Sequence, residues 1–458
     1  MQIGRVMVAG EESGCGKSTV AVGLMGALAA AGLAVQGFKA GPDFIDPSYY
    51  RAVSGRAGRN LDLWMLSAEA VLELFLRNGR TADVAVIEGV MGLFDGAYPD
   101  DTGSAAHLAK VLQTPVLLVL DASRSSASLG AKALGFRAFD PGVALRGVIV
   151  NGVAGKAHEQ AVRQAVERAG LPVVGVIPRV PEIQLPERHL GLIPLREGKV
   201  PEARCRQIVE RVGSHLDLPQ ILRIAGEAPP LPDIAPVLFP PPPRTSEFRL
   251  AVARDEAFTF YYEDNLDLLR HWGFDVVEFS PLHDATLPPA DLLYLGGGFP
   301  EVFAEALSQN VAMREALLRF ERRGEPLYGE CGGFMYLGES LTTADGRSFP
   351  MVGLLPIQTV MCEHLQALKY VGVEVLKGGA FFRPGDRLKG HEFHHSRLIA
   401  GEGPHAFRSV DSAGRVEEGG LVHGGAFASY THLHLASNPL LLESLTARLR
   451  SRVKGRRG

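Results

Sequence analysis

Cys331 is the side chain best placed for covalent chemistry in this sequence. It lies in the segment Gly329–Gly333, between a strand-like run at Leu327-Tyr328 and a pair of glycines that suit the start of a helix. A thiol at a helix N-terminus meets the partial positive charge of unpaired N–H groups, which favours the thiolate, and small neighbours leave room for a substrate carbonyl. The pattern predicts a nucleophile elbow.

Cleavage of an amide by a thiolate also requires a general base and an oxyanion hole. His432 and His434 are two residues apart, so on a strand they face the same way and either could reach Cys331. Gly297 and Gly298 carry no side chain that would block their backbone N–H groups, and we expect them to bind the oxyanion. Together these residues predict a site that cleaves an amide.

A second site is predicted near the start of the chain, in a phosphate loop that contains Gly14, Gly16, Lys17, Ser18 and Thr19. Backbone N–H groups of such a loop cradle phosphate oxygens, the lysine contacts the β- and γ-phosphates, and the serine can bind Mg²⁺. The usual spacing would place a glycine where Glu11 stands, so this loop has one extra residue after Gly10. We expect ATP as a co-substrate, together with Mg²⁺.

Four carboxylates follow predicted strands of the same half: Asp43, Asp46, Glu88 and Asp95. Ligands of open parallel sheets bind at the carboxyl ends of the strands, so these side chains should converge on the phosphate loop. Hard oxygen ligands suit Mg²⁺ bridging phosphates, although each carboxylate alone could instead cap a turn or pair with a cation. Asn151, at the end of another strand, could contact adenine or form an ordinary Asn-Gly turn.

Alternating apolar runs and amphipathic stretches predict the elements that position these residues. In the first half, near-continuous β-branched runs alternate with helical patterns, which predicts a doubly wound parallel sheet. The expected strands are Val6–Ala9, Val35–Phe38, Val84–Ile87, Val116–Leu120, Val148–Asn151 and Val173–Ile177, and the expected helices are Lys17–Ala31, Ala68–Arg77, Ser104–Leu112 and His158–Ala169.

A proline-rich stretch separates two predicted α/β domains. Prolines recur between residues 229 and 243, where they cannot continue a helix or an inner strand. We therefore predict an ATP-binding domain over residues 1–228, a linker over 229–246 and a second domain over 247–447. Expected elements of the second domain are strands at Phe248–Ala253, Leu292–Leu295 and Ala428–Leu435, with helices near Tyr261–Trp272 and Glu301–Arg322.

Composition argues against several classes of function. A formal net charge of −4 over 458 residues disfavours a nucleic-acid or membrane-surface partner held by charge. Four cysteines without paired spacing form no disulfide framework, and no apolar run approaches a bilayer span. Because no leader is recognisable, we expect a cytoplasmic protein. Cys362–His364 and Gly390–Ser396 lack zinc spacing, and we interpret them as substrate-contacting or packing segments.

The whole chain resembles the cobyrinic acid a,c-diamide synthase family, called hydrogenobyrinic acid a,c-diamide synthase in the aerobic cobalamin route. Its N-terminal half is similar to that family's dethiobiotin-synthetase-like ATP domain through the variant phosphate loop, Phe38–Pro47, Arg59–Asp62 and Glu88–Gly96. Its C-terminal half resembles a class I glutamine amidotransferase domain of the cobyric acid synthase type, with His432 in the Tyr-x-His position.

This resemblance implies that Cys331 attacks the side-chain amide of glutamine and that ammonia then displaces phosphate from an acyl phosphate, made from ATP and a corrinoid carboxylate. The c- and a-carboxylates would be amidated in turn. By the same resemblance His432 is the base, Lys17 stabilises the transferred phosphoryl group, Mg²⁺ is held by Ser18, Asp43 and Glu88, and Asp46 and Asp95 position the substrate or phosphoryl group. No acidic residue follows His432 where other class I amidotransferases carry one.

Several alternatives stay open at this point. Cobyric acid synthase and nickel-sirohydrochlorin a,c-diamide synthase perform the same chemistry on other substrates, and Leu433-His434 after the first histidine favours the diamide synthase over cobyric acid synthase. The sequence does not separate cobalt, metal-free and nickel tetrapyrroles. A partitioning-type ATPase switch is disfavoured by the Cys331 elbow. His434 stays the alternative base, and a homodimer is left open.

Overall fold

The computed structural model describes residues 1–97, 100–179, 187–188, 191–192, 202–240, 246–401 and 403–457. The chain divides into two compact units, Met1–Ala235 and Pro236–Gly458. This division falls inside the proline-rich segment 229–246, of which residues 241–245 lie outside the described residues. Both units are α/β, so the predicted fold class is confirmed.

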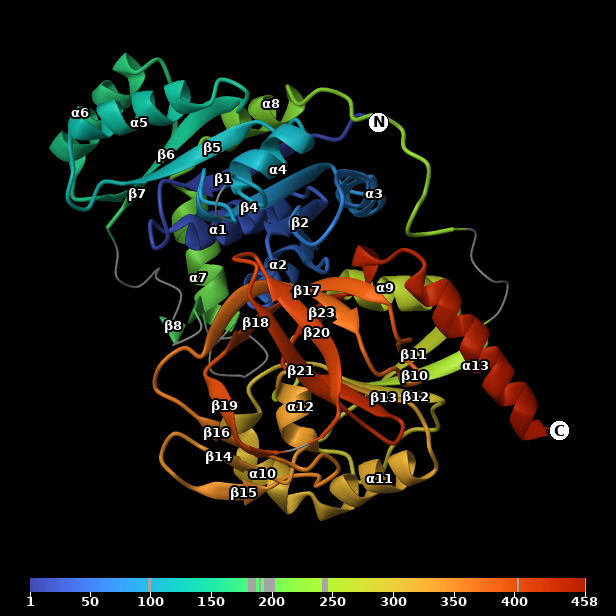
Figure 1. Cartoon of the computed structure of the whole chain (residues 1–458). Coiled ribbons are helices and arrows are strands. Elements are labelled where there is room, and N and C mark those ends of the chain that lie inside the picture. Colours follow the sequence, from blue (N-terminus) through green and yellow to red (C-terminus); the bar gives the residue numbers. More distant parts are fainter. Residues whose placement is uncertain are drawn as a thin grey trace. The chain divides into compact units, whose positions relative to one another are not determined.

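The first unit is a parallel sheet covered by helices on both faces. Its seven strands among the described residues have the order β3-β2-β4-β1-β5-β6-β7. Figure 1 shows α5 beside α6 on one face and α1 beside α7 on the other. The strands are β1 (Arg5–Gly10), β2 (Val35–Ala40), β3 (Arg59–Leu61), β4 (Val84–Gly92), β5 (Val116–Asp121), β6 (Leu145–Val153) and β7 (Val173–Pro178).

Six helices of the first unit, α1 to α6, connect successive strands of the sheet, as in a doubly wound fold, and α7 and α8 follow the last strand. They are α1 (Lys17–Ala30), α2 (Asp46–Ser54), α3 (Ala68–Gly79), α4 (Ala105–Val111), α5 (Ser128–Phe139), α6 (Lys156–Arg168), α7 (Glu202–Gly213) and α8 (Leu218–Gly226); β8 (Glu187–Arg188) and β9 (Gly191–Leu192) form a separate short pair. Two glycines of α1 let α7 approach closely, because a Cβ on Gly23 would lie 2.4 Å from the side chain of Val212, and one on Gly26 would lie 2.2 Å from Val209.

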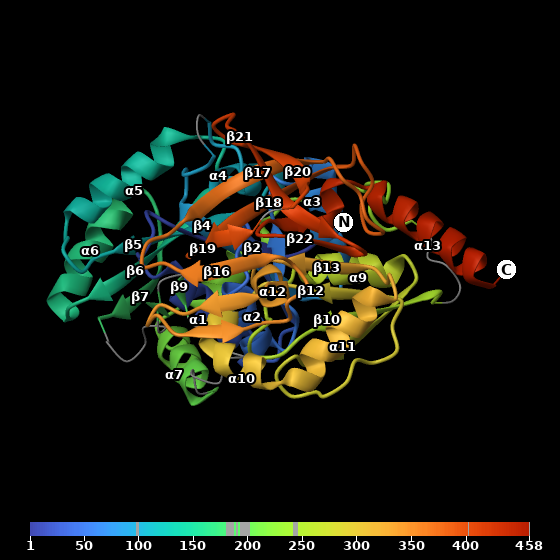
Figure 2. The same cartoon turned by 60° about the horizontal axis from the view of Figure 1, so that its bottom comes forward.

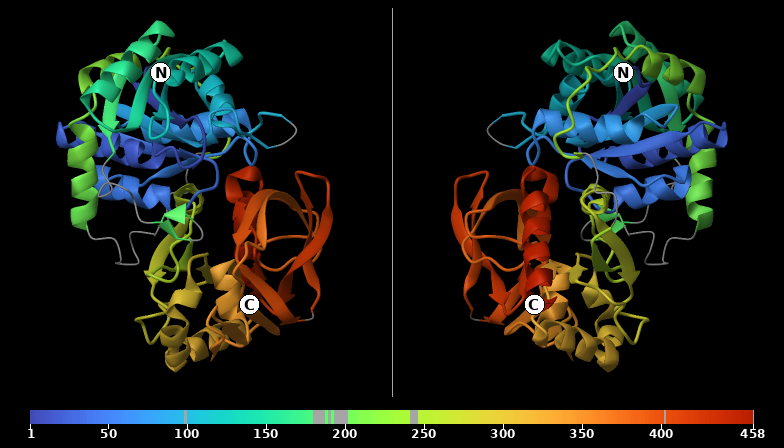
Figure 3. Two further views of the ribbon diagram at one scale, coloured as in Figure 1. Left: turned by 90° about the vertical axis from the view of Figure 1, so that its left-hand side faces the viewer. Right: turned by 90° about the vertical axis from the view of Figure 1, so that its right-hand side faces the viewer.

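The second unit is built on a sheet that is parallel in one half and antiparallel in the other. Among the described residues its order is β11-β10-β12-β13-β22-β21-β20-β17-β18-β23. The first five strands of this order run parallel, and the pairs from β22 onward are antiparallel. Figure 3 shows the antiparallel strands, in orange and red, curving away from the parallel ones.

A smaller sheet of order β15-β14-β16-β19 completes this unit, and Figure 2 shows β16 beside β19. The strands of the second unit are β10 (Phe248–Ala253), β11 (Phe274–Phe279), β12 (Leu292–Leu295), β13 (Leu327–Glu330), β14 (Ser340–Thr342), β15 (Ser348–Pro350), β16 (Ile357–Met361), β17 (Ala367–Val375), β18 (Arg387–His394), β19 (Ser396–Gly401), β20 (His405–Asp411), β21 (Val416–His423), β22 (Ala426–Ser429) and β23 (His432–His434). Its α-helices are α9 (Glu263–His271), α10 (Ala304–Gln309), α11 (Val311–Arg322), α12 (Gly332–Leu337) and α13 (Leu441–Arg457).

Two expected elements of the second unit are each broken in the structure. The helix predicted over Glu301–Arg322 is a 3₁₀ turn followed by α10 and α11, because the Asn310 side chain accepts a hydrogen bond from Met313 N (3.2 Å) and starts a new helix. The strand predicted over Ala428–Leu435 is β22 and β23, which pair with different neighbours. The Ser429 hydroxyl accepts from Thr431 N (3.1 Å) and stabilises the bend between them.

Within the part of the chain that the structure describes, no helix is both long enough and apolar enough to cross a bilayer.

Candidate active sites

Cys331 lies at the carboxyl end of β13, between two parallel neighbours, β12 and β22. Its backbone has φ 47°, a left-handed conformation that is strained for a residue with a side chain. Cys331 N donates a hydrogen bond to Ser429 O (2.7 Å), and α12 begins at the next residue. The strand, the strained turn and the helix reproduce the geometry of a nucleophile elbow.

Glycines allow the elbow to lie against the loop that follows β12. A Cβ on Gly333 would lie 2.2 Å from Leu295 O, and Gly333 N donates to Gly296 O (2.9 Å). The two expected oxyanion donors differ in their present partners. Gly297 N donates to Phe260 O (3.3 Å), whereas Gly298 N lies 3.0 Å from the position that a Cβ on Gly332 would take. The amide of Gly298 is thus beside the residue that follows the nucleophile.

His432 is buried beside the thiol and hydrogen-bonds Cys331. Its Nδ1 atom lies 3.6 Å from Oε2 of Glu330, the residue before the nucleophile. Burial alone would lower the pKa of this imidazole, but the Cys331 sulfur and the Glu330 carboxylate outweigh it and raise the pKa to about 9. The positive form of His432 is therefore stabilised next to the thiol.

His434 has a different environment from His432, although both belong to β23. Its ring is fully buried, 4.6 Å from the Tyr262 ring between centroids, and neither ring nitrogen has a hydrogen-bond partner among the described residues. Desolvation lowers its pKa to about 3. A histidine that is neutral and packed in this way is poorly suited to accept a proton, so the geometry favours His432 as the base.

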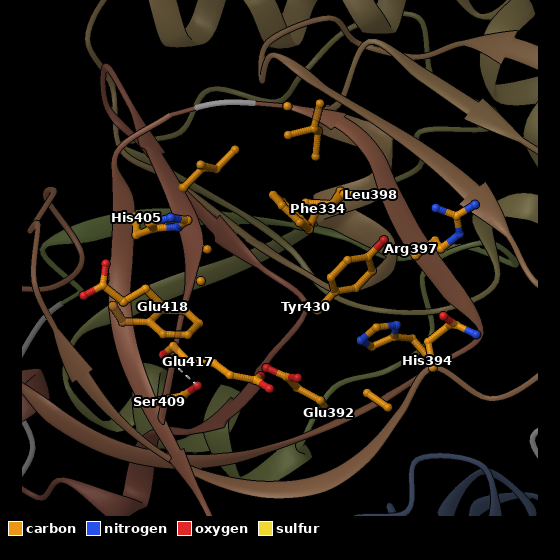
Figure 4. Close-up of a pocket in the computed structure, with 18 of the residues that line it drawn as sticks. Phe334, Glu392, His394, Arg397, Leu398, His405, Ser409, Glu417, Glu418 and Tyr430 are labelled. Atoms are coloured by element: carbon orange, nitrogen blue, oxygen red, sulfur yellow. Dashed lines mark hydrogen bonds between the residues drawn. The ribbon is translucent and has the colours of Figure 1, made fainter. Parts of the chain in front are cut away.

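A pocket of about 590 Å³ opens next to the thiol site. Phe334 of α12 and Tyr430, two residues before His432, line it, and the rest of its wall comes mainly from β16 and β19 of the smaller sheet and from β17, β18, β20 and β21 (Figure 4). Glu392 and Lys369 bring opposite charges to the wall, with Lys369 Nζ 3.5 Å from Glu392 Oε2. Glu392 Oε1 also accepts a hydrogen bond from the Thr431 hydroxyl (2.7 Å), which ties this charge to the neighbour of His432.

The phosphate loop connects β1 to α1, and Gly14 and Gly16 have positive φ (81° and 93°). Lys17, at the start of α1, is 8% exposed. Asn151, which we considered as an adenine contact, donates its amide Nδ2 to Cys15 O (3.0 Å). Asn151 also packs directly against Gly16, because a Cβ on Gly16 would lie 2.2 Å from Asn151 Nδ2. Both contacts indicate that Asn151 supports the loop.

A buried charge cluster adjoins the phosphate loop. Lys39 on β2 is the register partner of Glu88 on β4, and Lys39 Nζ lies 2.6 Å from Glu88 Oε1 and 2.5 Å from Asp46 Oδ2. The Ser18 hydroxyl donates to the same Glu88 oxygen (2.6 Å). Tyr50 donates to the other Glu88 oxygen (2.5 Å). Lys39 is not among the predicted site residues, although it lies inside Phe38–Pro47, one of the segments that carry the family resemblance.

The carboxylates of this cluster are balanced by Lys39. Burial raises the pKa values of Asp46 and Glu88, and the Lys39 ammonium opposes that effect. For Lys39, burial lowers the pKa, but the charges of Asp46 and Glu88 outweigh it and leave the pKa above its usual value. Ser18 and Glu88 bring two hard oxygens together beside the phosphate loop, a donor set that suits Mg²⁺.

The remaining two predicted carboxylates form turns in the structure. Asp43 Oδ1 accepts from Ile45 N (2.7 Å) and Asp46 N (3.1 Å), directly before α2. Asp95 Oδ2 accepts from Gly92 N (2.8 Å) after β4. The structure therefore brings Ser18, Asp46 and Glu88 together around Lys39, whereas Asp43 and Asp95 stabilise neighbouring loops.

Comparison with known proteins covers both halves of the chain. Residues 6–193 match the CobQ/CobB/MinD/ParA nucleotide binding domain, and residues 249–440 match the CobB/CobQ-like glutamine amidotransferase domain. Cobyrinate a,c-diamide synthase of Dehalococcoides mccartyi (strain CBDB1) is 41% identical over 97% of this chain and 98% of its own length. The enzymes of the same name from Listeria monocytogenes serotype 4b (40% identity, 96% of this chain, 98% of the relative) and Archaeoglobus fulgidus (42%, 96% and 96%) are similarly close.

Identity at this level over nearly the whole of both chains confirms the resemblance that the motifs indicated. The protein is a glutamine-dependent amidating enzyme with a nucleotide-binding domain. The chain belongs to the cobyrinate a,c-diamide synthase family.

Proposed function

We propose that this protein uses ATP and glutamine to convert the a- and c-carboxylates of cobyrinic acid, or of its metal-free counterpart hydrogenobyrinic acid, into amides. The observation that carries this proposal is one chain that holds both a Cys331–His432 elbow and a phosphate loop beside buried carboxylates. Its relatives named cobyrinate a,c-diamide synthase support the substrate class.

At the thiol site, the Cys331 sulfur attacks the amide carbon of the glutamine side chain. The oxyanion that forms accepts hydrogen bonds from backbone N–H groups; Gly298, and Gly332 directly after the nucleophile, are the proposed donors, since Gly297 N already donates to Phe260 O. The carbon–nitrogen bond then breaks, and His432 gives a proton to the departing ammonia. Water, deprotonated by His432, hydrolyses the resulting thioester to glutamate and regenerates the thiol.

At the nucleotide site, an oxygen of the corrinoid carboxylate attacks the γ-phosphorus of ATP, and ADP leaves. This activation is needed because a carboxylate would otherwise have to expel oxide. Ammonia then attacks the acyl carbon and phosphate departs. Lys17 stabilises the charge on the transferred phosphoryl group, and the backbone of Gly14–Thr19 holds the phosphates.

Mg²⁺ would neutralise phosphate charge at this site, with Ser18 and Glu88 as its ligands. Asp43 shares in this binding or contacts the substrate, since its charge acts on both Lys39 and Asp46. Asp46 and Asp95 position the corrinoid carboxylate or the phosphoryl group.

We further propose that the enzyme works in the cytoplasm, where a reducing environment keeps the Cys331 thiol active. Its partners are small-molecule substrates alone. A homodimer is compatible with this chemistry.

The substrate is tested with purified protein, ATP, Mg²⁺, glutamine and either cobyrinic or hydrogenobyrinic acid. Mass spectrometry of the product should count two new amides on the preferred acid. Four new amides on an a,c-diamide substrate would instead identify a cobyric acid synthase. Amidation of nickel-sirohydrochlorin alone would identify a nickel-sirohydrochlorin a,c-diamide synthase. ATP hydrolysis without amide formation on any of them would overturn the proposal.

The pocket beside Cys331 suits the amino-acid end of glutamine, and Glu392 would bind its α-ammonium group. Replacing Glu392 by glutamine keeps the acceptor for Thr431 but removes the charge, and we expect the KM for glutamine to rise about 10- to 100-fold, the value of one hydrogen bond to a charged group. Ammonia-dependent amidation should be unchanged. The matched control is Glu418→Gln, which neutralises an exposed carboxylate of the same pocket, 3.4 Å from Arg408.

An analogue of glutamine that lacks the α-amino group sharpens this test. The wild-type enzyme and the Glu392→Gln variant should hydrolyse this analogue equally, because it has no ammonium group for the Glu392 carboxylate to bind. A variant that is impaired with glutamine and with the analogue to the same extent would contradict this role of Glu392.

Of the two candidate bases, His432 should matter far more than His434. We expect His432→Ala to reduce glutaminase turnover by about 10³-fold or more, because the thiolate loses its proton partner. His434→Phe, which fills the same apolar space beside Tyr262, should retain most of the turnover. Steady-state glutamate release measures both variants, and the reverse order would move the base to His434.

A further inference from the structure

No acidic residue stands two positions after the general base of the thiol site. Leu433, His434 and Leu435 follow His432, and His434 is packed as a neutral ring. A histidine that takes and gives protons during catalysis needs a partner for its other nitrogen, because that partner fixes the ring and stabilises its charged form. The structure offers such a partner from a different part of the chain.

Glu330, at the end of β13, is 2% exposed and directs Oε2 toward Nδ1 of His432 at 3.6 Å. This separation is longer than a hydrogen bond, and such contacts often shorten when the substrate binds. The same oxygen accepts from the Tyr294 hydroxyl (2.8 Å). The other oxygen accepts from the Tyr328 hydroxyl (2.5 Å) and from Leu433 N (3.1 Å).

These three donors compensate for the burial of a carboxylate and fix its direction. Burial and the negative charge of Glu330 raise the pKa values of Tyr294 and Tyr328 well above the usual value, so both phenols stay neutral donors. The hydrogen bond from Leu433 N also links the carboxylate to the backbone beside His432. The position of the base is thereby coupled to the strand that carries the nucleophile.

We propose that Glu330 is the positioning residue for His432: its carboxylate holds Nδ1–H and stabilises the imidazolium that forms when Nε2 takes the proton of the Cys331 thiol. The inference depends on the proposed glutaminase role of Cys331 and His432. No proton moves to Glu330 in this scheme; the thiol proton passes to His432 and then to the departing ammonia. The nucleophile and the residue that orients its base are then adjacent in the sequence.

The other titratable groups around His432 do not supply this negative charge. His391 on β18 stacks on His432 with ring centroids 5.0 Å apart, and its Nδ1 atom is 2.8 Å from the Tyr262 hydroxyl. Burial is the largest cause that lowers the pKa of His391 well below the usual value, and the neighbouring His432 acts in the same direction, so His391 is neutral. The titratable groups that act on His432 or on which His432 acts are Glu330, Cys331, His391 and His394.

The test is Glu330→Gln in the full-length protein, which keeps the shape of the side chain and removes its charge. We expect the kcat for glutamine hydrolysis to fall at least about tenfold, with little change in KM. Glu330 raises the pKa of His432, so its removal lowers that pKa, and the imidazolium needed to protonate ammonia is lost at a lower pH. The alkaline limb of the kcat profile should therefore move to lower pH.

Tyr328→Phe is the matched control, because it loosens the same buried network but keeps the charge facing His432. Its alkaline limb should stay in place. Glu330→Asp keeps the charge but moves it away from His432, because the side chain is one methylene shorter. We expect a kcat between those of the wild type and Glu330→Gln, and this variant replaces Glu330→Gln in the test if the latter does not fold. Ammonia-dependent amidation should be retained in every folded variant and reports an intact nucleotide site.

The inference would be overturned by a wild-type kcat and alkaline limb in Glu330→Gln, or by equal losses in Glu330→Gln and Tyr328→Phe without a shift of that limb. Wild-type kcat in Glu330→Asp would do so as well. Failure of the underlying function is distinguishable, because it would appear as glutaminase activity that survives in Cys331→Ala.

Discussion

Replacing Cys331 by alanine is expected to abolish glutamine-dependent amidation while leaving ammonia-dependent amidation intact. In the proposed mechanism the sulfur forms the bond to the glutamine carbonyl, and loss of a nucleophile typically costs about 10⁴- to 10⁶-fold in turnover. Alanine retains a Cβ, so the strained φ of 47° at this position is not relieved and the elbow should keep its shape. Glutamate release and corrinoid amidation, each measured with both nitrogen donors, provide the readout.

A second thiol in the same unit provides the control for this experiment. Cys362 is half-buried, and its Sγ lies 3.9 Å from Val360 O, so Cys362→Ala removes a thiol without touching the elbow. That variant should behave like the wild type with glutamine and with ammonia. Equal loss of both activities in Cys331→Ala would contradict the role of Cys331 as the nucleophile for glutamine.

Replacing Lys17 by alanine is expected to remove amidation with either nitrogen donor, by about 10³-fold or more. In the proposed mechanism its ammonium group is the cation that the phosphate loop brings to the β- and γ-phosphates, and a single cation on a transferring phosphoryl group commonly contributes this much. Because the acyl phosphate cannot form, added ammonia should not rescue the variant. Formation of ADP and of amide product should fall together.

The control for Lys17 is a lysine that contacts the same loop from outside. Lys132 Nζ lies 2.7 Å from Glu11 Oε2, and its side chain is 45% exposed, so Lys132→Ala should cost little. If Lys17→Ala retains amidation with ammonia, the assignment of this loop to phosphoryl transfer is wrong.

The two reactive centres were predictable because local patterns specify them. Glycines around Cys331 permit the strained turn and the close approach of Gly333 to Leu295 O, and glycines before Lys17 provide the positive φ values of the phosphate loop. These requirements depend on residues near one another in the sequence. The parallel strands were predictable for a similar reason, since strands covered on both faces need continuous apolar runs.

The partners of these centres could not be predicted in the same way. Lys39 and Glu88 meet only because β2 and β4 are neighbours in register, and Glu330 reaches His432 only because β23 returns close to the end of β13. Such pairings depend on strand order, which local patterns do not contain. The bend between β22 and β23 was missed because Ser429 and Thr431 are compatible with a continuous strand, and only their hydrogen bond distinguishes the turn.

The left-handed turn at Cys331 also bears on when the enzyme becomes active during its own maturation. This backbone conformation is held by the Cys331 N to Ser429 O and Gly333 N to Gly296 O hydrogen bonds, so segments about a hundred residues apart must assemble around it. In a nascent or partly unfolded chain this residue would relax to an ordinary extended backbone, and the Cys331 sulfur would no longer be oriented for attack. Glutamine would then not be hydrolysed until the last of these segments has been synthesised and packed against the others.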